Sequence, residues 1–317
     1  MQGVILAAGK GSRLHPITTQ RSKAMLPILG RPIVERVMEV LAANGVQEFI
    51  LVVSRVDSEI VRYFEEESPL EAEIRFVVQE ERLGMADALK YAAPHIRGTF
   101  ILSACDNLVP AKHVAELIAC HRTHREINAV LSLMRVDRSL LSRVGVVEMD
   151  GEWVTRIVEK PGPEEAPSDI ASLPLYVFTP RILDYLPEVK LSPRGEYELQ
   201  DAIQMLIQRD GRVRGVFTES RLQLTGPRDL LVINRHYLVN GYDRPQLAPY
   251  TVGPNTHLIT PLRIEEGTTI GEGCVIGPRV YIERDCRIGS NVTIKDAVVL
   301  REAVVESGAM VVGEVVS

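Results

Sequence analysis

The chain has 317 residues, 45% of them hydrophobic and 25% charged, and 36 Lys and Arg against 42 Asp and Glu leave a net charge of −6. This length predicts about two domains and excludes a miniprotein stapled by disulfides. Without a long block of either charge, a large nucleic-acid or anionic-membrane footprint is not expected. Apolar runs such as EFILVV fall short of the roughly 18 residues that a membrane span needs. We therefore expect a soluble protein with no nucleic-acid and no membrane partner.

The first residues and the cysteines indicate the cellular compartment in which the protein is expected. The start MQGVILAAGKG lacks the charged-then-apolar layout of a secretory signal and runs straight into an apolar strand pattern. Cys105, Cys120, Cys274 and Cys286 are scattered, with no C-x-x-C pair. Unpaired thiols suit a reducing compartment, so we expect a cytoplasmic protein without a zinc site or a disulfide.

Residues 3–135 alternate between two patterns. Short β-branched runs are each followed by an amphipathic stretch, in the order GVILAA, PIVERVMEVLAANG, EFILVVS, EIRFVVQ, MADALKYAA, TFILSACD, HVAELIACHR and INAVLSLMRV. Continuous apolar strands separated by helices predict an α/β fold with a mostly parallel sheet buried on both faces. Such sheets bind ligands at the carboxyl ends of their strands.

The pattern changes between about residues 144 and 217. VGVVEMDGEWVTRIVEKP predicts a hairpin that turns at Asp150 and Gly151, and a helix is expected from about Glu198. We interpret this stretch as a second half that closes over the first.

The tail repeats every six residues. The first series is aliphatic without exception: Val252, Leu258, Ile264, Ile270, Ile276, Ile282, Ile288, Ile294 and Leu300. The second series, four residues later each time, is mostly small or β-branched: Thr256, Leu262, Thr268, Cys274, Val280, Cys286, Val292, Val298 and Val304. This period predicts a parallel β-helix whose flat faces point one aliphatic side chain inward per hexad, and an antiparallel sheet is the alternative.

These patterns predict the domain organisation. Two prolines and a glycine interrupt the periodicity in NGYDRPQLAPY. We therefore expect an α/β domain over residues 1–240, a linker over 241–250 and the β-helix over 251–317.

A glycine-rich turn follows the first predicted strand, in LAAGKGSRL. Such a turn lets backbone N–H groups approach phosphate oxygens, so Leu6, Ala8, Gly9 and Gly11 are candidate nucleotide-binding residues. The sequence fits neither G-x-x-x-x-G-K-[ST] nor G-x-G-x-x-G, in which Leu14 would replace the third glycine. Alone, the segment could equally be a plain tight turn.

The continuation LAAGKGSRLHPITTQRSKAMLPILGRPIVERVMEVL resembles the sugar-1-phosphate nucleotidyltransferases. Their pattern is L-A-A-G-x-G-x-R-L-x-P-x-T, then K-x-x-L-P, then G-[KR]-P ahead of a helix. QEERLGMADAL, ILSACDN, VGVVEMD, IVEKP and GPRDLLVINRHYL resemble later segments of the same family in the same order. The resemblance covers residues 3–238, and a hexapeptide tail is a frequent appendage of the family.

The resemblance implies a fold and a reaction. The fold is a nucleotide-diphospho-sugar transferase domain, Rossmann-like with a mostly parallel sheet, followed by a left-handed parallel β-helix. The reaction joins an NTP and a sugar 1-phosphate into an NDP-sugar and pyrophosphate. Because both reacting groups are anionic, catalysis depends on positioning and charge neutralisation by cations and Mg²⁺.

The resemblance also implies roles for single residues. Arg13 would hold the leaving pyrophosphate and Lys23 the α-phosphate region, although in isolation either residue could be an exposed loop cation. Asp106 would ligate Mg²⁺ and contact the nucleotide, and Gln223 occupies the position of the second metal ligand. A strand-end Asp can also be a plain turn cap.

The sugar and base sites follow in the same way. Lys160 would grip the sugar phosphate, with Glu159, Gly145 and Ser172 on the sugar, and the alternative for Glu159 and Lys160 is a solvated turn before Pro161. Gln79 would read the base with backbone groups near Gly84. A side-chain amide offers one donor and one acceptor, which suits uracil or thymine, so UTP or dTTP is expected ahead of GTP.

Some positions depart from the family pattern. Cys105 replaces the usual glycine before the metal-binding Asp, Ser172 and Pro174 stand where many members have Asn and Gly, and Gln223 replaces a carboxylate. These departures favour, as an alternative, a weak or inactive homologue that binds nucleotide sugars in a regulatory role. Another alternative is a bifunctional enzyme whose solenoid transfers acetyl groups, for which His257 is the one histidine beyond Thr251.

The tail has a further expected role. The flat faces and terminal coils of a solenoid offer aliphatic surface that a neighbouring copy can cover. We therefore expect a homo-oligomer assembled through the β-helix. The residues do not determine which sugar 1-phosphate is used.

Overall fold

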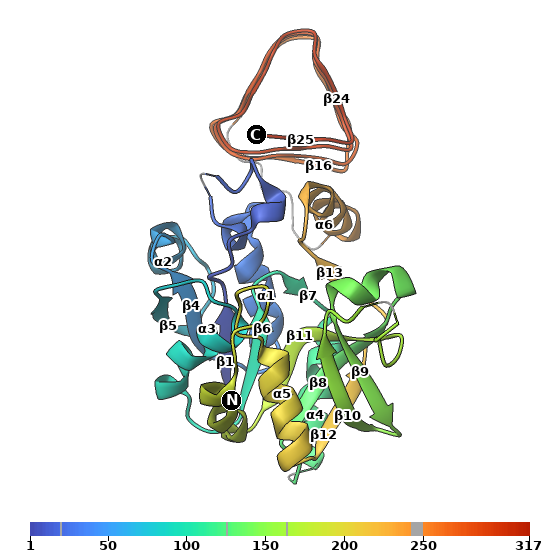
Figure 1. Ribbon diagram of the computed structural model, residues 1–317. Helices are drawn as coiled ribbons and strands as arrows, with labels where there is room; N and C mark the ends of the chain where they lie inside the picture. The colour runs from blue at the N-terminus through green and yellow to red at the C-terminus, as the bar shows by residue number, and fades with distance from the viewer. Residues whose placement is uncertain (20, 125, 163, 242–249) are drawn as a thin grey trace. The chain divides into compact units, whose positions relative to one another are not determined.

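The computed structural model describes residues 1–19, 21–124, 126–162, 164–241 and 250–317 (Figure 1). These residues form two compact units. The first unit comprises Met1–Lys10 and Val34–Arg221, and the second unit comprises Gly11–Ile33 and Leu222–Ser317. Residues 242–249, which make up most of the predicted linker, lie outside the described residues.

A nine-stranded sheet forms the centre of the first unit. Its order is β5-β4-β1-β6-β11-β8-β12-β10-β9, and β11 also pairs with β9. The bounds of these strands are β1 Gln2–Leu6, β4 Glu48–Ser54, β5 Glu73–Gln79, β6 Phe100–Ala104, β8 Ala129–Arg135, β9 Gly145–Asp150, β10 Trp153–Glu159, β11 Ile170–Phe178 and β12 Val213–Phe217. A short strand, β7, covers Asn107–Leu108.

The predicted strands are confirmed, and the parallel pairing holds for half of the sheet. Strands β5, β4, β1 and β6 are parallel neighbours, as are β8 and β12. Strand β11 runs antiparallel to both β6 and β8, and β9 and β10 form the predicted hairpin. The α/β pattern thus persists through four strands before the sheet becomes mixed.

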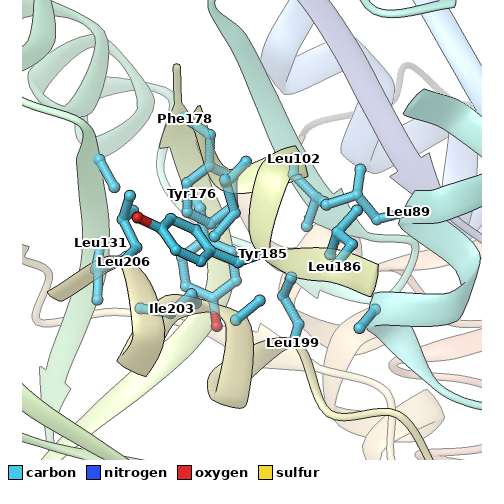
Figure 2. Close-up of a cluster of buried hydrophobic side chains, with 14 of the residues drawn as sticks. Leu89, Leu102, Leu131, Tyr176, Phe178, Tyr185, Leu186, Leu199, Ile203 and Leu206 are labelled. Atoms are coloured by element: carbon cyan, nitrogen blue, oxygen red, sulfur yellow. The ribbon is translucent and has the colours of Figure 1, made fainter. Parts of the chain in front are cut away.

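Four helices lie near the predicted positions: α1 Ile33–Ala42, α3 Met85–Ala92, α4 Ala111–Thr123 and α5 Leu199–Arg209. A further helix, α2 Ser58–Glu66, was not predicted. In α3 the buried residues Ala86, Leu89 and Ala92 recur at three-residue spacing, which gives the helix one apolar face. Aromatic side chains of β11 and leucines of α3, β6, β8 and α5 meet in one buried cluster (Figure 2).

The second unit contains the solenoid and one long helix, α6 (Pro227–Asn240). Three four-stranded parallel sheets, β14-β17-β20-β23, β15-β18-β21-β24 and β16-β19-β22-β25, form the sides of a triangular coil (Figure 1). Their strands are β14 Thr251–Val252, β15 His257–Leu258, β16 Leu262–Ile264, β17 Thr269–Ile270, β18 Val275–Ile276, β19 Val280–Ile282, β20 Arg287–Ile288, β21 Thr293–Lys295, β22 Val298–Val299, β23 Val304–Val305, β24 Met310–Val312 and β25 Val315–Val316. The predicted parallel β-helix is confirmed, and the antiparallel alternative is wrong.

The two hexapeptide series are correct up to Ile294 and then shift by one residue. Coils align with an offset of 18 residues at first (Leu262↔Val280), but β19 pairs with β22 as Ile282↔Val299, an offset of 17. The step after Ile294 is therefore five residues long. In the first series, Val299 takes the inward position predicted for Leu300, and Val305 follows it six residues later. In the second series, Ala297 and Ala303 take the inward positions predicted for Val298 and Val304.

The ends of the first series also deviate from the prediction. Val252 is exposed and Leu258 is only partly buried, because both belong to the first coil and have a neighbour on one side only. Within the described residues, no helix has both the length and the apolar character required to cross a membrane.

Candidate active site

The carboxyl ends of neighbouring parallel strands bring three predicted nucleotide-binding residues to one edge of the sheet. Leu6 ends β1 and lies opposite Ala104 of β6, two residues before Asp106. Gln79 ends β5 and lies opposite the last residue of β4. Because parallel strands share a direction, Leu6, Gln79 and Asp106 occupy the edge at which open α/β sheets bind ligands.

The glycine-rich turn begins directly after β1, at this edge of the sheet. Ala8 is buried and Gly9 is exposed. The backbone N–H of Cys105 donates to the carbonyl of Leu6 over 3.2 Å, which joins this turn to the segment of Asp106. The buried Cys105 side chain thus fills the position where glycine was expected.

Gln79 is almost fully buried, with 2% of its surface exposed. Its side-chain nitrogen donates to the carboxylate of Asp87 over 2.7 Å and to the carbonyl of Gly84 over 3.3 Å. Both partners can only accept hydrogen bonds, so the orientation of the amide is fixed. Gln79 therefore uses its donors within the protein, and its carbonyl oxygen is the group left for a ligand.

Gly84 has structural reasons to be glycine. Its φ is +102°, and a Cβ would lie 2.7 Å from the carbonyl oxygen of Tyr197. That carbonyl accepts from the N–H of Ala86 over 3.0 Å, while the N–H of Tyr197 donates to Leu83 over 2.7 Å. These bonds fix the loop that precedes α3.

The three predicted sugar-binding residues form a row across adjacent strands. Gly145 of β9 pairs with Glu159 of β10 and with Ser172 of β11. A Cβ on Gly145 would lie 3.2 Å from the Glu159 carboxylate, so the glycine allows the close approach. Ser172 is buried, and its hydroxyl lies 3.2 Å from the hydroxyl of Tyr176.

The Glu159 carboxylate is held on one side only. Its Oε1 contacts Lys160 Nζ at 3.2 Å and Arg194 Nη2 at 3.3 Å, whereas its buried Oε2 has no partner among the described residues. Burial raises the pKa of Glu159 above its usual value, and the charge of Lys160 offsets part of that rise. A buried acceptor without a partner is what a sugar hydroxyl would satisfy.

A second carboxylate extends this cluster. Arg194 donates to Glu198 over 2.6 Å as well as to Glu159, and Ser192 donates to Glu198 over 2.8 Å. Arg194 thus bridges two acids, and only Glu159 was predicted from the sequence.

Asp106 lies next to a buried cation. Arg221 donates from Nε to the side chain of Asn107 over 2.7 Å. Burial lowers the pKa of Arg221, and the charge of Asp106 opposes that shift. Burial raises the pKa of Tyr176, the charge of Glu159 adds to that rise, and the charge of Arg221 opposes it. The Tyr176 hydroxyl, which lies beside Ser172, is thus within the electrostatic influence of both Glu159 and Arg221.

The second unit holds the other predicted residues. Gly11 has a φ of +63° and precedes η1 (Ser12–Leu14), and its carbonyl accepts from the Thr18 hydroxyl over 2.9 Å. A Cβ on Gly11 would lie 3.0 Å from Cβ of Lys23, the first residue of η2 (Lys23–Met25). The predicted phosphate cation Lys23 thus lies against the glycine turn, whereas Arg13 is exposed.

Gln223 also belongs to the second unit. It ends the short strand β13 (Leu222–Gln223) and is partly buried. Neither unit by itself holds all of the predicted residues, because the first unit contains Asp106 and the sugar row while the second contains Gly11, Arg13, Lys23 and Gln223.

The donor set fits a metal ion only in part. Among the described residues, no group of three or more His, Cys, Asp or Glu side chains could hold a metal. Asp106 is the one acid of the Asp106 and Gln223 pair, and Mg²⁺ needs only one or two carboxylates when phosphates supply the other oxygens. These residues fit an ion that arrives with a triphosphate.

An α/β sheet with a glycine-rich turn, a fixed amide and a buried Asp at the carboxyl ends of its strands defines a nucleotide-binding protein. Residues 2–221 match the family described as "Nucleotidyl transferase", and residues 258–317 match the "GMPPB C-terminal domain". The chain belongs to the nucleotidyl transferase family.

Two curated relatives illustrate the similarity. The UTP–glucose-1-phosphate uridylyltransferase AglF of Haloferax volcanii is 36% identical over 67% of this chain and 85% of its own length. The bifunctional protein GlmU of Methanococcus maripaludis is 33% identical over 75% of this chain. The aligned region spans about half of that relative, 54% of its length.

A solved structure shares the fold. The crystal structure of UDP-glucose pyrophosphorylase complexed with UDP-glucose superposes with a TM-score of 0.68. The match covers 75% of this chain and 98% of that chain at 22% sequence identity.

Sequence reasoning missed five residues of the first-unit site: Asp87, Tyr176, Arg194, Glu198 and Arg221. Asp87 lies inside the segment QEERLGMADAL, which resembles the family, and Arg221 lies two residues before Gln223, the predicted metal ligand. A charged residue beside a recognised motif was thus a usable signal. Arg194 lies in an irregular loop without a pattern, and Tyr176 is part of an apolar strand.

Proposed function

We propose that this protein transfers a nucleotidyl group from UTP or dTTP to a sugar 1-phosphate. An oxygen of the sugar phosphate attacks the α-phosphorus, a new P–O bond forms, and the bond to the β-phosphate breaks to release pyrophosphate. The observation that carries this proposal is the pairing in one unit of a nucleotide edge, with Gln79 and Asp106, and a sugar row, with Gly145, Glu159 and Ser172.

The base preference is supported by the fixed amide of Gln79. Its free carbonyl oxygen can accept the N3–H of uracil or thymine, while the backbone near Gly84 completes the contact. Cytosine has an acceptor at N3 and would meet this oxygen unfavourably.

The sugar phosphate would meet the Glu159 and Lys160 pair. Lys160 neutralises phosphate charge, and the unpartnered Oε2 of Glu159 accepts a sugar hydroxyl. Arg13 and Lys23 complete the charge neutralisation on the triphosphate side, with the backbone of Leu6, Ala8, Gly9 and Gly11 around the phosphates.

Mg²⁺ would be held by Asp106 and the substrate phosphates, with Gln223 as a neutral oxygen ligand. When bound, the ion supplies charge neutralisation at the phosphate oxygens. Arg221 adds a fixed positive charge beside Asp106.

The test is pyrophosphate release from a panel of NTPs and sugar 1-phosphates. UTP or dTTP should be used far better than GTP, because each mismatched buried polar group costs about 1–3 kcal/mol. Comparable turnover with GTP or ATP would refute the assignment of the base. Tight binding of a nucleotide sugar without turnover would favour the regulatory alternative, and acetyl transfer from acetyl-CoA would favour the bifunctional one.

The remaining parts of the proposal concern organisation. We propose a transferase domain over residues 1–240, a linker over 241–250, and a left-handed β-helix over 251–317 through which copies associate. The free thiols of Cys120, Cys274 and Cys286 support a reducing, cytoplasmic setting.

A further inference from the structure

The segment that carries two of the proposed phosphate cations packs against the solenoid. Residues Gly11–Ile33, which include Arg13 and Lys23, belong to the same compact unit as the β-helix. Family resemblance places this segment in the transferase domain, so its contacts with the tail are informative.

The strongest contact is a buried, bidentate ion pair. Arg21 Nη1 donates to Glu283 Oε2 over 3.0 Å, and Nη2 donates to Oε1 over 2.7 Å. Only 6% and 10% of the two side chains are exposed. Glu283 directly follows β19, and its Oε2 also accepts the backbone N–H of Arg301 from the next coil over 2.8 Å. Two coils of the solenoid therefore fix the acid that holds Arg21.

A second contact lies at the other end of the segment. The hydroxyl of Tyr281, a fully buried residue of β19, accepts the backbone N–H of Gly30 over 3.0 Å. A Cβ at Gly30 would lie 2.3 Å from Glu265 Oε1 and 2.5 Å from Arg263 Nη2. Gly30 thus lies close to the solenoid, and its φ of +79° is a backbone conformation that favours glycine.

Helix α6 adds a third contact. The side chain of Asn234 accepts the N–H of Leu29 over 2.9 Å and donates to the carbonyl of Pro27 over 3.1 Å. The segment is therefore fixed at Arg21 and again at residues 27–30.

Lys23 lies between these fixed points. It begins η2 two residues after Arg21, and Ser22 caps that turn by accepting the N–H of Ala24 over 3.3 Å. The base of Lys23 lies against Gly11, next to Arg13. Movement at Arg21 would be transmitted through one short turn to Lys23 and then to the glycine turn.

We propose that the solenoid is a positioning element of the transferase, and that Arg21 and Glu283 are positioning residues that hold Lys23 and Arg13 in place. The inference rests on the proposed function, since it gives these two cations their task. Glu283 reaches no substrate and acts through Arg21.

The test compares two isosteric variants of the full chain. Glu283→Gln removes the charge that holds Arg21. Asp296→Asn is the matched control, because it breaks another bidentate pair of the solenoid, Arg279 with Asp296. Within the described residues, the hydrogen bonds and ion pairs of this pair do not involve Gly11–Ile33. Thermal unfolding of both variants establishes that each is folded.

We expect Glu283→Gln to lower kcat roughly ten- to a hundred-fold, because small misplacements of positioning groups have effects of that size. The KM of the sugar 1-phosphate should stay unchanged, since Arg13 and Lys23 serve the triphosphate. Asp296→Asn should keep wild-type kcat. Equal kcat values for the two variants would overturn the proposal and leave Glu283 with a structural role.

Hydrogen–deuterium exchange gives a readout that does not depend on activity. In Glu283→Gln, amides of residues 11–33 should exchange faster while those of residues 48–54 are unchanged, and Asp296→Asn should leave residues 11–33 as in the wild type. Unchanged exchange in Glu283→Gln would refute the anchoring. A wild-type protein that releases no pyrophosphate would refute the proposed function instead, and the exchange result would still decide whether the solenoid orders the segment.

Discussion

The amide of Gln79 donates to two acceptors, and in the proposed base site this arrangement would distinguish one pyrimidine from another. Uracil and thymine carry a donor at N3, whereas cytosine carries an acceptor there. With its nitrogen committed to Asp87 and Gly84, Gln79 would present its oxygen to the base and select the N3–H under the proposed function. Asp87 would then influence base choice without contacting the base.

Replacing Asp87 with Ala should therefore reduce the preference for UTP over CTP. A hydrogen bond to a charged group contributes about 1.5–3 kcal/mol, so the ratio of the two kcat/KM values should fall by roughly ten-fold or more. Glu80→Gln is the control, because it neutralises an exposed acid one residue after Gln79. If the UTP to CTP ratio is the same in Asp87→Ala and wild type, Asp87 does not orient the amide.

Glu159 is expected to lower stability in return for function. Its folded pKa is raised by burial, so its favourable contribution to the free energy of unfolding is present at low pH and is lost as pH rises through the raised pKa. The Gln side chain carries no charge, so Glu159→Gln removes the cost of burying an ionised carboxylate. The variant should therefore have a higher melting temperature than the wild type at neutral pH. It should also raise the KM of the sugar 1-phosphate.

A contrasting acid provides the control. Arg209 lowers the pKa of the exposed Glu188, so its contribution is present above the unfolded pKa and is lost as pH falls. Glu188→Gln should therefore lower the neutral-pH melting temperature slightly and leave KM unchanged. A lower melting temperature in Glu159→Gln than in wild type would contradict the assigned cause.

The proposed Mg²⁺ site predicts opposite effects at its two protein ligands. Asp106→Asn removes the one carboxylate and should cost several orders of magnitude in turnover, whereas Gln223→Asp should lower the Mg²⁺ concentration for half-maximal rate. Both are measured as pyrophosphate release against Mg²⁺ concentration. Near-normal activity of Asp106→Asn at saturating Mg²⁺ would show that Asp106 is not the ligand.

At the level of elements, the shortened coil gives a test within one strand. Val305 of β23 points inward, while its neighbour Val304 is 57% exposed. Val305→Thr buries a hydroxyl and should reduce the free energy of unfolding by about 1–3 kcal/mol. Val304→Thr should change it by less than about 0.5 kcal/mol, as surface substitutions usually do. Denaturant unfolding should therefore show a clearly lower free energy of unfolding for Val305→Thr than for Val304→Thr. A larger loss in Val304→Thr would mean that Val304 points inward, as an unbroken six-residue repeat predicts.

The coil and β11 show where the sequence pattern was sufficient and where it was not. Aliphatic periodicity predicted the solenoid because each inward position is occupied by a side chain that needs burial. The positions of Leu300 and Val304 were predicted wrongly because both the inward position and its neighbour are occupied by aliphatic or small residues. The sequence pattern therefore looks the same with a five-residue step as with a six-residue step. Pro174 lies where the pairing of β11 with β8 shifts between Leu173 and Tyr176, an irregularity that accommodates a proline inside a sheet.

The candidate site was predicted unevenly for a similar reason. Leu6 and Gln79 end strands and Asp106 follows the end of β6 by two residues, and strand ends follow from local apolar runs. The contacts of Arg194 with Glu159 and of Arg221 with Asn107 join residues 35 and 114 positions apart in the chain. Such contacts depend on the tertiary fold and carry no local signal.

At the level of the whole molecule, the exposed apolar residues of the solenoid bear on assembly. Val304, Met310 and Val312 are 57%, 76% and 49% exposed. Burying such surface in a contact between copies would be favourable, at about 25 cal/mol per Å² of apolar area. We expect light scattering at micromolar concentration to show an oligomer, and Met310→Glu to reduce its mass. A monomeric wild type would contradict the proposal, and Glu306→Gln, which alters an exposed polar neighbour, is the control.

The bond between Arg21 and Glu283 also constrains how this protein can be recombined with others. A designer who exchanges the tail for that of a homologue would cut near residue 250, where the periodicity begins. A foreign tail without an acid and a tyrosine at these positions would leave Arg21 without its ion pair and the N–H of Gly30 without its acceptor. A working chimera must therefore exchange residues 11–33 together with the tail, or carry Tyr281 and Glu283 into the new one. The practical unit of exchange in this chain is discontinuous.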